Sequence, residues 1–371
     1  MTTAPNHLFS PLQQRSLTLP NRIVVSPMCE YSSVDGHASD WHLVHLGSRA
    51  VGGAGVVFTE ATAVSPEGRI TPSDLGIWSD DHIPQLARIT EFIKAHGSIP
   101  AMQLAHAGRK ASMSVPWETP SRTLTPAEGG WTNVVAPSPL RFHDEYPLPH
   151  QLDRAGMDKV IADFIAATKR AVQAGFLLVE VHAAHGYLAN EFLSPLSNTR
   201  TDEYGGSLQN RAKFPLEIIR AVRATFPQDL PVWVRVSAVD WVEGGLSLED
   251  TIEFARLVKA EGIDLLDTSS GGNDPRQQIP VGPGYQVAFA ETIRRETGLA
   301  TGAVGMITAP SQADQIIRTG QADAVLLARE LLRDPYWPIH AAEALHLTPS
   351  YPVQYERAAA HKPNRRQPFS K

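Results

Sequence analysis

The order of apolar and polar runs along the chain predicts alternating strands and helices. Short apolar runs opened by glycine, such as 55–61 and 175–181, are typical of strands that are buried on both faces. Segments with helical spacing, such as 157–174, lie between them. The predicted strands cover residues 21–25, 55–61, 99–104, 175–181, 231–236, 265–269, 300–305 and 324–329. The predicted helices cover residues 41–50, 81–96, 157–174, 211–225, 248–261, 289–297 and 310–319.

This pattern predicts an α/β protein with the architecture of a (β/α)₈ TIM barrel. A chain of 371 residues suits one barrel with insertions or two smaller domains, and eight alternating strands favour one domain over residues 1–371. Two segments, about 105–151 and 186–210, interrupt the alternation, and prolines recur in the first. Irregular segments of that length usually cap a site, so we expect a lid over the carboxyl-terminal mouth of the barrel. A C-terminal arm covers about 350–371.

Charge and cysteine usage exclude several classes of function. The formal net charge is −6 and the body of the chain holds no basic run, so neither nucleic acid nor an anionic membrane is an expected partner. The single cysteine, Cys29, excludes an internal disulfide framework and an all-cysteine metal or iron–sulfur site. Residues 1–6 lack an apolar signal region and no run of eighteen apolar residues occurs, so we expect a soluble, cytoplasmic protein.

Three polar rings follow the predicted fourth strand directly. They belong to His182, His185 and Tyr187. The carboxyl ends of barrel strands are where such enzymes carry out their chemistry. Two imidazoles can hold an oxygen atom and a phenol can deliver a proton. The competing interpretation is one structural histidine and a packing tyrosine, but the combination at one strand end favours a functional site.

Other strand ends carry groups that suit a flavin. Gly305 and Arg329 follow the last two strands, where barrels often bind phosphate, although a tight turn with a surface arginine would give the same pattern. Arg235 places a cation at a strand end, where burial is costly without an anion. Gln103 can offer a donor and an acceptor to a planar amide edge. Together these groups describe a site for flavin mononucleotide (FMN).

A set of motifs now gives a specific resemblance. These motifs are Ser26-Pro27-Met28-Cys29 with Tyr31, Glu60-Ala61, and the segments 103–110, 182–187, 200–207, 303–305, 328–335 and 354–357, with Arg235. In this order they resemble the old yellow enzyme family of FMN-dependent ene-reductases over nearly the whole chain. With cysteine at position 29 the chain most resembles the thermophilic-like class, since the classical enzymes of the family carry threonine there.

The resemblance implies the roles of individual residues. His182 and His185 would bind the substrate carbonyl, Tyr187 would donate a proton, and Tyr31 would also contact the substrate. Cys29 would lie near the reactive flavin nitrogen and tune its potential. NADPH or NADH would reduce the flavin, which would then reduce an activated alkene. The residues implied to contact the non-covalent FMN are Ser26, Pro27, Met28, Cys29, Ala61, Gln103, Arg235, Gly305, Ala328 and Arg329.

The resemblance also implies an assembly. It predicts a homodimer or homotetramer in which Arg357 of one chain enters the neighbour's site and contacts the substrate. Residues 358–371 continue beyond the point where the family usually ends, so the geometry of this arm stays open.

Two other functions fit part of the pattern. A metal-dependent barrel hydrolase could bind zinc through His182 and His185, but the later strand ends carry Arg235, Ser269 and Arg329, and two cations would repel a metal. We therefore predict no metal. A non-catalytic flavin-binding sensor would explain the FMN residues but not the two histidines with Tyr187. The physiological substrate, the choice between NADPH and NADH, and the stereochemistry stay open.

Overall fold

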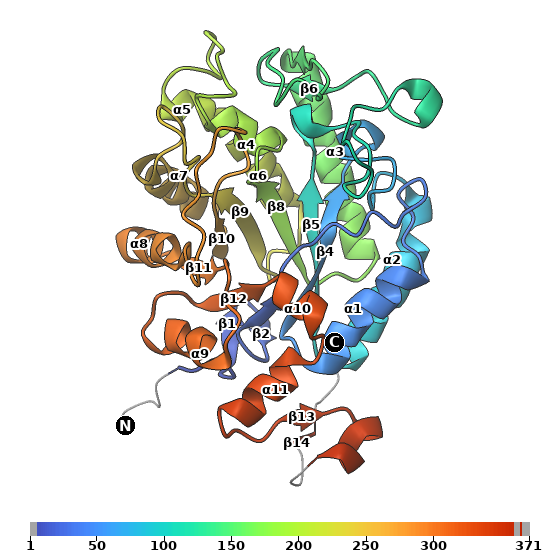
Figure 1. Cartoon of the computed structure of the whole chain (residues 1–371), viewed down its shortest axis with the longest axis vertical. Helices are drawn as coiled ribbons and strands as arrows, with labels where there is room; N and C mark the ends of the chain where they lie inside the picture. The colour runs from blue at the N-terminus through green and yellow to red at the C-terminus, as the bar shows by residue number, and fades with distance from the viewer. Residues whose placement is uncertain (1–5, 360–363, 366–371) are drawn as a thin grey trace.

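Eight parallel strands close into a barrel in the computed structural model, which describes residues 6–359 and the backbone of 364–365. The prediction of a (β/α)₈ barrel is therefore confirmed. Around the barrel the strand order is β3-β4-β5-β8-β9-β10-β11-β12, which is the order of the chain (Figure 1). The strands are β3 Ile23–Val25, β4 Val56–Ala63, β5 Ile99–Ala105, β8 Leu178–Ala183, β9 Val232–Ser237, β10 Leu265–Ser269, β11 Ala300–Ala303 and β12 Ala324–Leu327.

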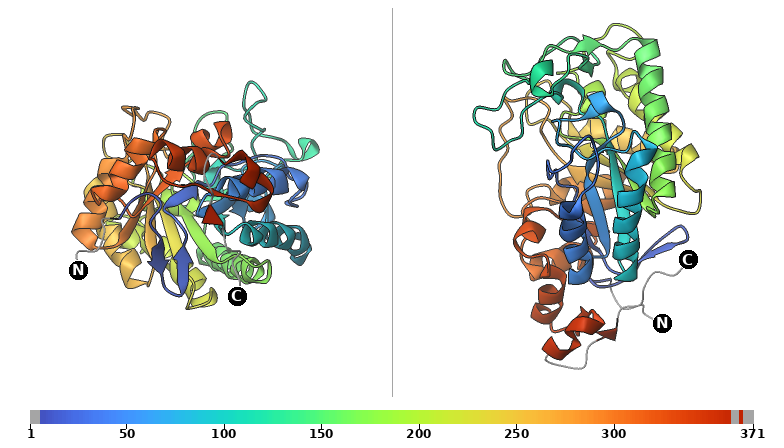
Figure 2. Two further views of the ribbon diagram at one scale, coloured as in Figure 1. Left: turned by 90° about the horizontal axis from the view of Figure 1, so that it is seen from below. Right: turned by 90° about the vertical axis from the view of Figure 1, so that its right-hand side faces the viewer.

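Helices lie around the outside of these strands (Figure 2). Local signals set their ends: Ser247 and Asp250 form a capping box at the start of α7, and Gly298 ends α8 in the left-handed conformation. The helices that follow the predicted pattern are α1 Asp40–Gly52, α2 Ile83–Ala95, α3 Arg154–Gln173, α6 Lys213–Thr225, α7 Leu248–Ala260, α8 Val287–Thr297 and α9 Pro310–Arg318. A short helix that the pattern did not predict, α5 Leu208–Arg211, precedes α6.

The amino-terminal end of the barrel is filled by large side chains. Phe58 and Trp233 pack with ring centroids 5.6 Å apart, and both are fully buried. The Trp233 indole N–H donates to Oε1 of Gln14 at 2.7 Å. Gln14 belongs to a hairpin of β1 Leu12–Gln14 and β2 Leu17–Leu19, which the sequence pattern did not predict. This end of the barrel is thereby closed.

The two irregular segments lie over the carboxyl ends of the strands, at the top of Figure 1. They are tied together by Arg200, whose Nη1 donates to the carbonyl oxygens of Leu152 at 2.7 Å and Pro137 at 3.1 Å. Hydrogen bonds of Arg200 therefore join the two segments at the rim of the mouth. The elements within these segments are η3 Gly108–Lys110, η4 Pro126–Glu128, β6 Val135–Ala136, β7 His150–Gln151 and α4 Leu188–Leu193.

The C-terminal segment runs to the opposite end of the molecule, at the bottom of Figure 1. After β12 the chain forms two helices and then a short arm, in which Tyr355 packs against Tyr336 with ring centroids 6.3 Å apart. No helix in the described part of the chain has both the length and the apolar composition needed to cross a membrane. The elements are α10 Arg329–Arg333, α11 Trp337–Ala344, β13 Ser350–Tyr351, η5 Val353–Ala358 and β14 Asn364–Arg365.

Candidate active site

The three rings at the carboxyl end of β8, those of His182, His185 and Tyr187, meet at the mouth of the barrel. The imidazole of His182 lies with its centroid 5.3 Å from that of His185 and 5.0 Å from the phenol ring of Tyr187. His185 and Gly186 both have positive φ, at 60° and 71°, and this turn brings the rings of His185 and Tyr187 edge-on to that of His182. The His185 backbone N–H donates to Ser237 Oγ at 2.9 Å, which holds the turn against β9.

Both histidines are held in the neutral form. Burial, followed by the charge of Arg235, lowers the pKa of His182 and of His185 well below its ordinary value. His185 Nε2 lies 2.7 Å from Ser269 Oγ, and His182 Nδ1 is buried without a hydrogen-bond partner in the described structure. A neutral imidazole keeps one N–H donor, so each ring can donate to an oxygen atom of a ligand.

Tyr187 carries a proton that it does not lose at neutral pH. Burial raises the pKa of Tyr187 and that of Tyr31. Tyr31 packs edge-on against Trp117 of the lid segment, with ring centroids 5.8 Å apart. Because phenols hydrogen-bond well in both directions, the two tyrosines can orient a polar ligand between the barrel and the lid.

A lysine that the sequence analysis did not assign lies beside Tyr187. Lys110 Nζ is 5.4 Å from the centre of the Tyr187 ring and 4.1 Å from that of Phe142. It donates to the backbone oxygen of His185 at 2.8 Å and to that of Gly272. Burial lowers the pKa of Lys110 to about 7, so its charge is sensitive to pH in the neutral range.

The segment after β3 brings Ser26, Pro27, Met28 and Cys29 to the same mouth. Burial raises the pKa of the Cys29 thiol well above its usual value, and the charges of Glu60 and Asp74 raise it further. Cys29 is therefore a neutral thiol and a poor nucleophile.

Buried polar side chains form a layer just inside the mouth. Arg235 donates from Nη1 to Ser26 Oγ at 3.1 Å, and its Nε lies 3.0 Å from Oδ2 of Asp267. Gln103 donates from Nε2 to Oε1 of Glu180 at 2.8 Å, and Ala61 is its neighbour on β4. This layer offers a cation and an amide to a planar ligand above it, which fits the pyrimidine part of a flavin.

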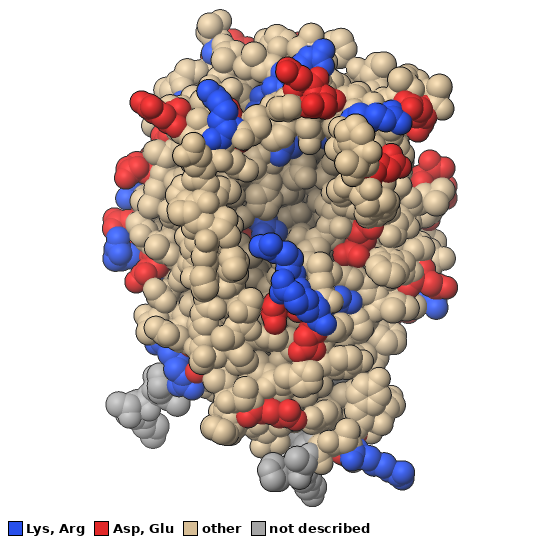
Figure 3. All heavy atoms as spheres, in the orientation of Figure 1, with Lys and Arg blue, Asp and Glu red and all other residues tan. Residues whose placement is uncertain are grey.

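A cavity of about 190 Å³ opens at the ends of β11 and β12, where it is lined by Gly305, Ala328 and Arg329. Gly305 has a φ of 122°, and a Cβ at this position would lie 2.8 Å from Nε2 of Gln286. A residue with a side chain would therefore be strained and would clash with Gln286. Figure 3 shows a hollow in this face of the molecule, with basic side chains along its rim. The cavity and the exposed guanidinium of Arg329 suit a phosphate group.

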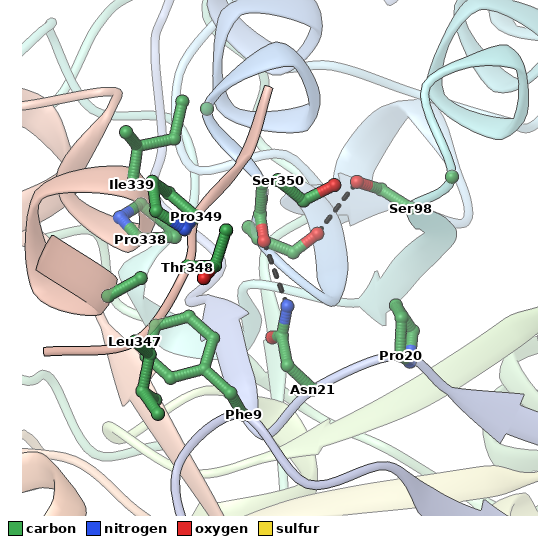
Figure 4. A pocket seen from close by; sticks show the side chains of 15 residues that line it. Phe9, Pro20, Asn21, Ser98, Pro338, Ile339, Leu347, Thr348, Pro349 and Ser350 are labelled. Atoms are coloured by element: carbon green, nitrogen blue, oxygen red, sulfur yellow. Dashed lines mark hydrogen bonds between the residues drawn. The ribbon is translucent and has the colours of Figure 1, made fainter. Parts of the chain in front are cut away.

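A larger cavity of about 360 Å³ lies at the opposite end of the barrel (Figure 4). Its lining is mostly apolar, and two of its polar side chains bond to the backbone: Asn21 to the oxygen of Gly53 at 2.9 Å and Ser98 to that of Ala54 at 2.7 Å. Arg357 lies in the arm at this same end and is exposed (Figure 1). The structure therefore brings the predicted site residues to one mouth except Arg357, which does not join the site of its own chain.

Glu180 and Asp267 are two further buried charges that the sequence analysis did not single out. Both interrupt apolar strands, β8 and β10, and both are fully buried. The argument applied to Arg235, that a buried charge is costly without a partner, would have found them. Among the described residues, no group of three or more histidine, cysteine, aspartate or glutamate side chains is arranged to hold a metal ion.

Known proteins of similar sequence and structure identify the family of this chain. A family described as "NADH:flavin oxidoreductase / NADH oxidase family" matches residues 7–348. The "NADPH dehydrogenase" of Geobacillus thermodenitrificans is 49% identical over 352 residues, which cover 94% of this chain and 98% of the relative.

Two solved structures give the same result for the fold. "Morphinone reductase" superposes with a TM-score of 0.79 at 29% identity, and the match covers 94% of this chain and 92% of that chain. An "old yellow enzyme homologue" from Zymomonas mobilis superposes with a TM-score of 0.77 at 24% identity, covering 93% of this chain and 94% of that chain, and shows the shared fold. The chain therefore belongs to the NADH:flavin oxidoreductase family of old yellow enzymes, and is an oxidoreductase that uses FMN with a reduced nicotinamide nucleotide as its reductant.

Proposed function

We propose that this enzyme reduces the carbon–carbon double bond of α,β-unsaturated carbonyl compounds. The observation that carries the proposal is the meeting of three rings at the mouth, where the His182 centroid lies 5.3 Å from that of His185 and 5.0 Å from that of Tyr187. Two neutral donors beside one phenol suit a substrate that has a carbonyl oxygen to bind and a carbon to protonate.

FMN held at this mouth would supply the redox chemistry, which is the transfer of hydride from the nicotinamide to the β-carbon of the alkene. His182 and His185 donate hydrogen bonds to the substrate oxygen. The negative charge that grows on this oxygen as the β-carbon is attacked is thereby stabilised. In a well-studied oxyanion site, loss of one such donor costs about 3–4 kcal/mol of activation free energy. The histidines thus bind the substrate and activate it in one arrangement.

Tyr187 delivers the proton to the α-carbon. Its high pKa keeps the phenol protonated before the reaction, and the ammonium group of Lys110 near the ring favours the phenolate that remains afterwards. Tyr31 covers the substrate from the side of β3 and the lid. Both proton and hydride are added to the alkene, so the product is the saturated carbonyl compound.

The residues that hold FMN are proposed from the same geometry. Arg329 and Gly305 bind the phosphate, with Ala328 beside them, while Gln103 and Arg235 contact the pyrimidine ring. The remaining side of the flavin is lined by Ser26, Pro27, Met28, Cys29 and Ala61. The neutral thiol of Cys29 adjusts the flavin potential and takes no covalent part, because its pKa is raised.

The two alternatives from the sequence do not fit the family. A non-catalytic sensor is contradicted by the enzymes that the chain resembles, and a metal-dependent hydrolase by the flavin family to which it belongs. We propose further that the enzyme is a homodimer or homotetramer with Arg357 at the neighbour's mouth. An exposed arginine on an arm far from its own site is suited to that role. The cytoplasmic location stays a prediction of the sequence.

Steady-state oxidation of NADPH and NADH, with cyclic enones, maleimides and nitroalkenes as acceptors, tests the proposed function. We expect turnover with these acceptors and a saturated product that mass spectrometry shows to be two mass units heavier. An enzyme that oxidises NADPH with oxygen but leaves every activated alkene unchanged would contradict the proposal. The same assay decides which nicotinamide nucleotide is preferred.

A further inference from the structure

A buried carboxyl group lies directly beside the amide of Gln103. Gln103 on β5 and Glu180 on β8 are register partners, and Nε2 of Gln103 donates to Oε1 of Glu180 at 2.8 Å. The two residues are 1% and 0% exposed, so neither group reaches bulk water. Glu180 and His182 alternate with Val181 along the strand, so Glu180 lies on the same face as His182, one layer further inside the barrel.

The hydrogen bond fixes which way the amide points. A glutamine amide has two N–H bonds and one carbonyl oxygen, and rotation by half a turn exchanges the nitrogen and oxygen ends. Glu180 accepts one N–H and so holds the nitrogen on its own side. One N–H and the carbonyl oxygen of Gln103 are then left for a ligand. The imide edge of a flavin has an N–H beside a carbonyl, which is the complementary pair.

Stability alone explains Glu180 poorly. Its Oε2 is buried and has no hydrogen-bond partner among the described residues, and an unsatisfied buried carboxyl oxygen is unfavourable for folding. The charged groups around it are Asp267 and Arg235 of the neighbouring strands. Burial, followed by the charge of Asp267, raises the pKa of Glu180, so the carboxyl is held mainly in its neutral form. Because its burial is unfavourable for folding, this carboxyl group is better explained by a role in the site.

We propose that Glu180 is a positioning residue, which orients the amide of Gln103 so that this amide recognises the imide edge of the flavin. The inference rests on the proposed contact of Gln103 with FMN. It assigns to Glu180 no contact with substrate or cofactor. Its effect is on the affinity for FMN and on the choice between flavins that differ at the imide nitrogen.

The test compares FMN with 3-methyl-FMN, in which a methyl group replaces the imide hydrogen. Full-length protein is stripped of flavin and rebuilt with each compound, and dissociation constants are measured by flavin fluorescence. Glu180→Met removes the acceptor at similar volume, whereas Glu180→Gln retains a carbonyl oxygen that can accept from Gln103. Thr268→Val is the matched control, because Thr268 is a buried polar residue on the alternate face of β10.

We expect wild type, Glu180→Gln and Thr268→Val to prefer FMN to 3-methyl-FMN by the same factor. In Glu180→Met that factor should fall about tenfold, because the hydrogen bond to the imide N–H is no longer held in place. Glu180→Asp, which withdraws the carboxyl by one methylene group, should lower the factor in the same direction and serves if the methionine variant does not fold.

Two outcomes would overturn the inference. If Glu180→Met lowered the affinities for FMN and 3-methyl-FMN equally, the effect would be structural, since a disturbed site does not distinguish the imide hydrogen from a methyl group. An unchanged preference in Gln103→Leu would remove the contact on which the inference rests. Either result leaves the proposed function intact if enones are still reduced, so the two proposals fail separately.

Discussion

The phenol ring of Tyr187 lies with its centroid 5.0 Å from the imidazole of His182, at an interplanar angle of 69°. The two side chains stand on opposite sides of a turn with positive φ at His185 and Gly186. A carbonyl oxygen bound by His182 is thus within a few ångströms of the phenol. This relationship separates the two proposed roles, oxygen binding and proton donation, between neighbouring rings.

Tyr187→Phe should slow the reduction of an enone by about 10²-fold or more, because general acid catalysis typically contributes that much. Reduction of the flavin by NADPH needs no proton donor, so its rate should stay close to that of wild type. Stopped-flow absorbance measures the two half-reactions separately. Tyr204→Phe is the control, since the Tyr204 hydroxyl contacts Glu217 at 3.2 Å outside the mouth. Equal slowing of both half-reactions would count against Tyr187 as the acid.

The second half-reaction should become slower as the pH rises through about 7. Lys110 has a pKa of about 7 because it is buried, so it is charged below this pH and neutral above it. The charged form stabilises the phenolate that Tyr187 leaves after donating its proton. In Lys110→Met this pH dependence should vanish, with the rate held at the slow level. Lys159→Met, which removes a surface partner of Glu67 and Asp163, should keep the wild-type profile.

Cys29→Ala should leave enone reduction active and shift the flavin midpoint potential by on the order of 30 mV, about 1.4 kcal/mol for a two-electron couple. The reason is that a neutral thiol beside the flavin contributes a polar contact and no covalent bond. Potentiometric titration of the holoenzyme gives the shift. An inactive variant that still binds FMN would show instead that the thiol takes part in the reaction.

Arg329→Met should lower the affinity for FMN about tenfold to a hundredfold and leave the affinity for riboflavin unchanged. A charge-assisted hydrogen bond to phosphate contributes on that scale, and riboflavin has no phosphate to lose. Flavin fluorescence with the stripped protein measures both affinities. The matched control is Arg318→Met, whose guanidinium pairs with Asp314 on α9. If the affinities for FMN and riboflavin fell to the same degree, Arg329 would not be the residue that binds the phosphate.

Arg357→Ala should raise the KM for the enone and keep the FMN content at one per chain, since the side chain is expected to contact substrate in a neighbouring subunit. Light scattering on wild type and variant gives the assembly state. A fully active monomer at assay concentration would falsify the shared site. If the oligomer persists and the kinetics are unchanged, only the role of Arg357 is wrong.

Sequence patterns are local, and they determined what is local in this protein. Each barrel strand and most helices could be placed because apolar spacing and capping residues act within a few positions of the chain. His182, His185 and Tyr187 could be grouped for the same reason, as they lie within six positions at the end of one strand. The hairpin of β1 and β2 and the helix α4 were missed, because short elements give little periodicity.

Only the tertiary structure decided which distant side chains meet. Gln103 and Glu180 are 77 positions apart, and Arg235 and Asp267 belong to different strands, so their contacts depend on the register in which the barrel closes. A shift of one residue would turn these side chains to the other face of the sheet, and no pattern within a single strand records that choice. The arm that carries Arg357 lies far from the mouth because tertiary contacts hold it there: Tyr355 packs against Tyr336, and the Tyr351 hydroxyl donates to Glu343 of α11.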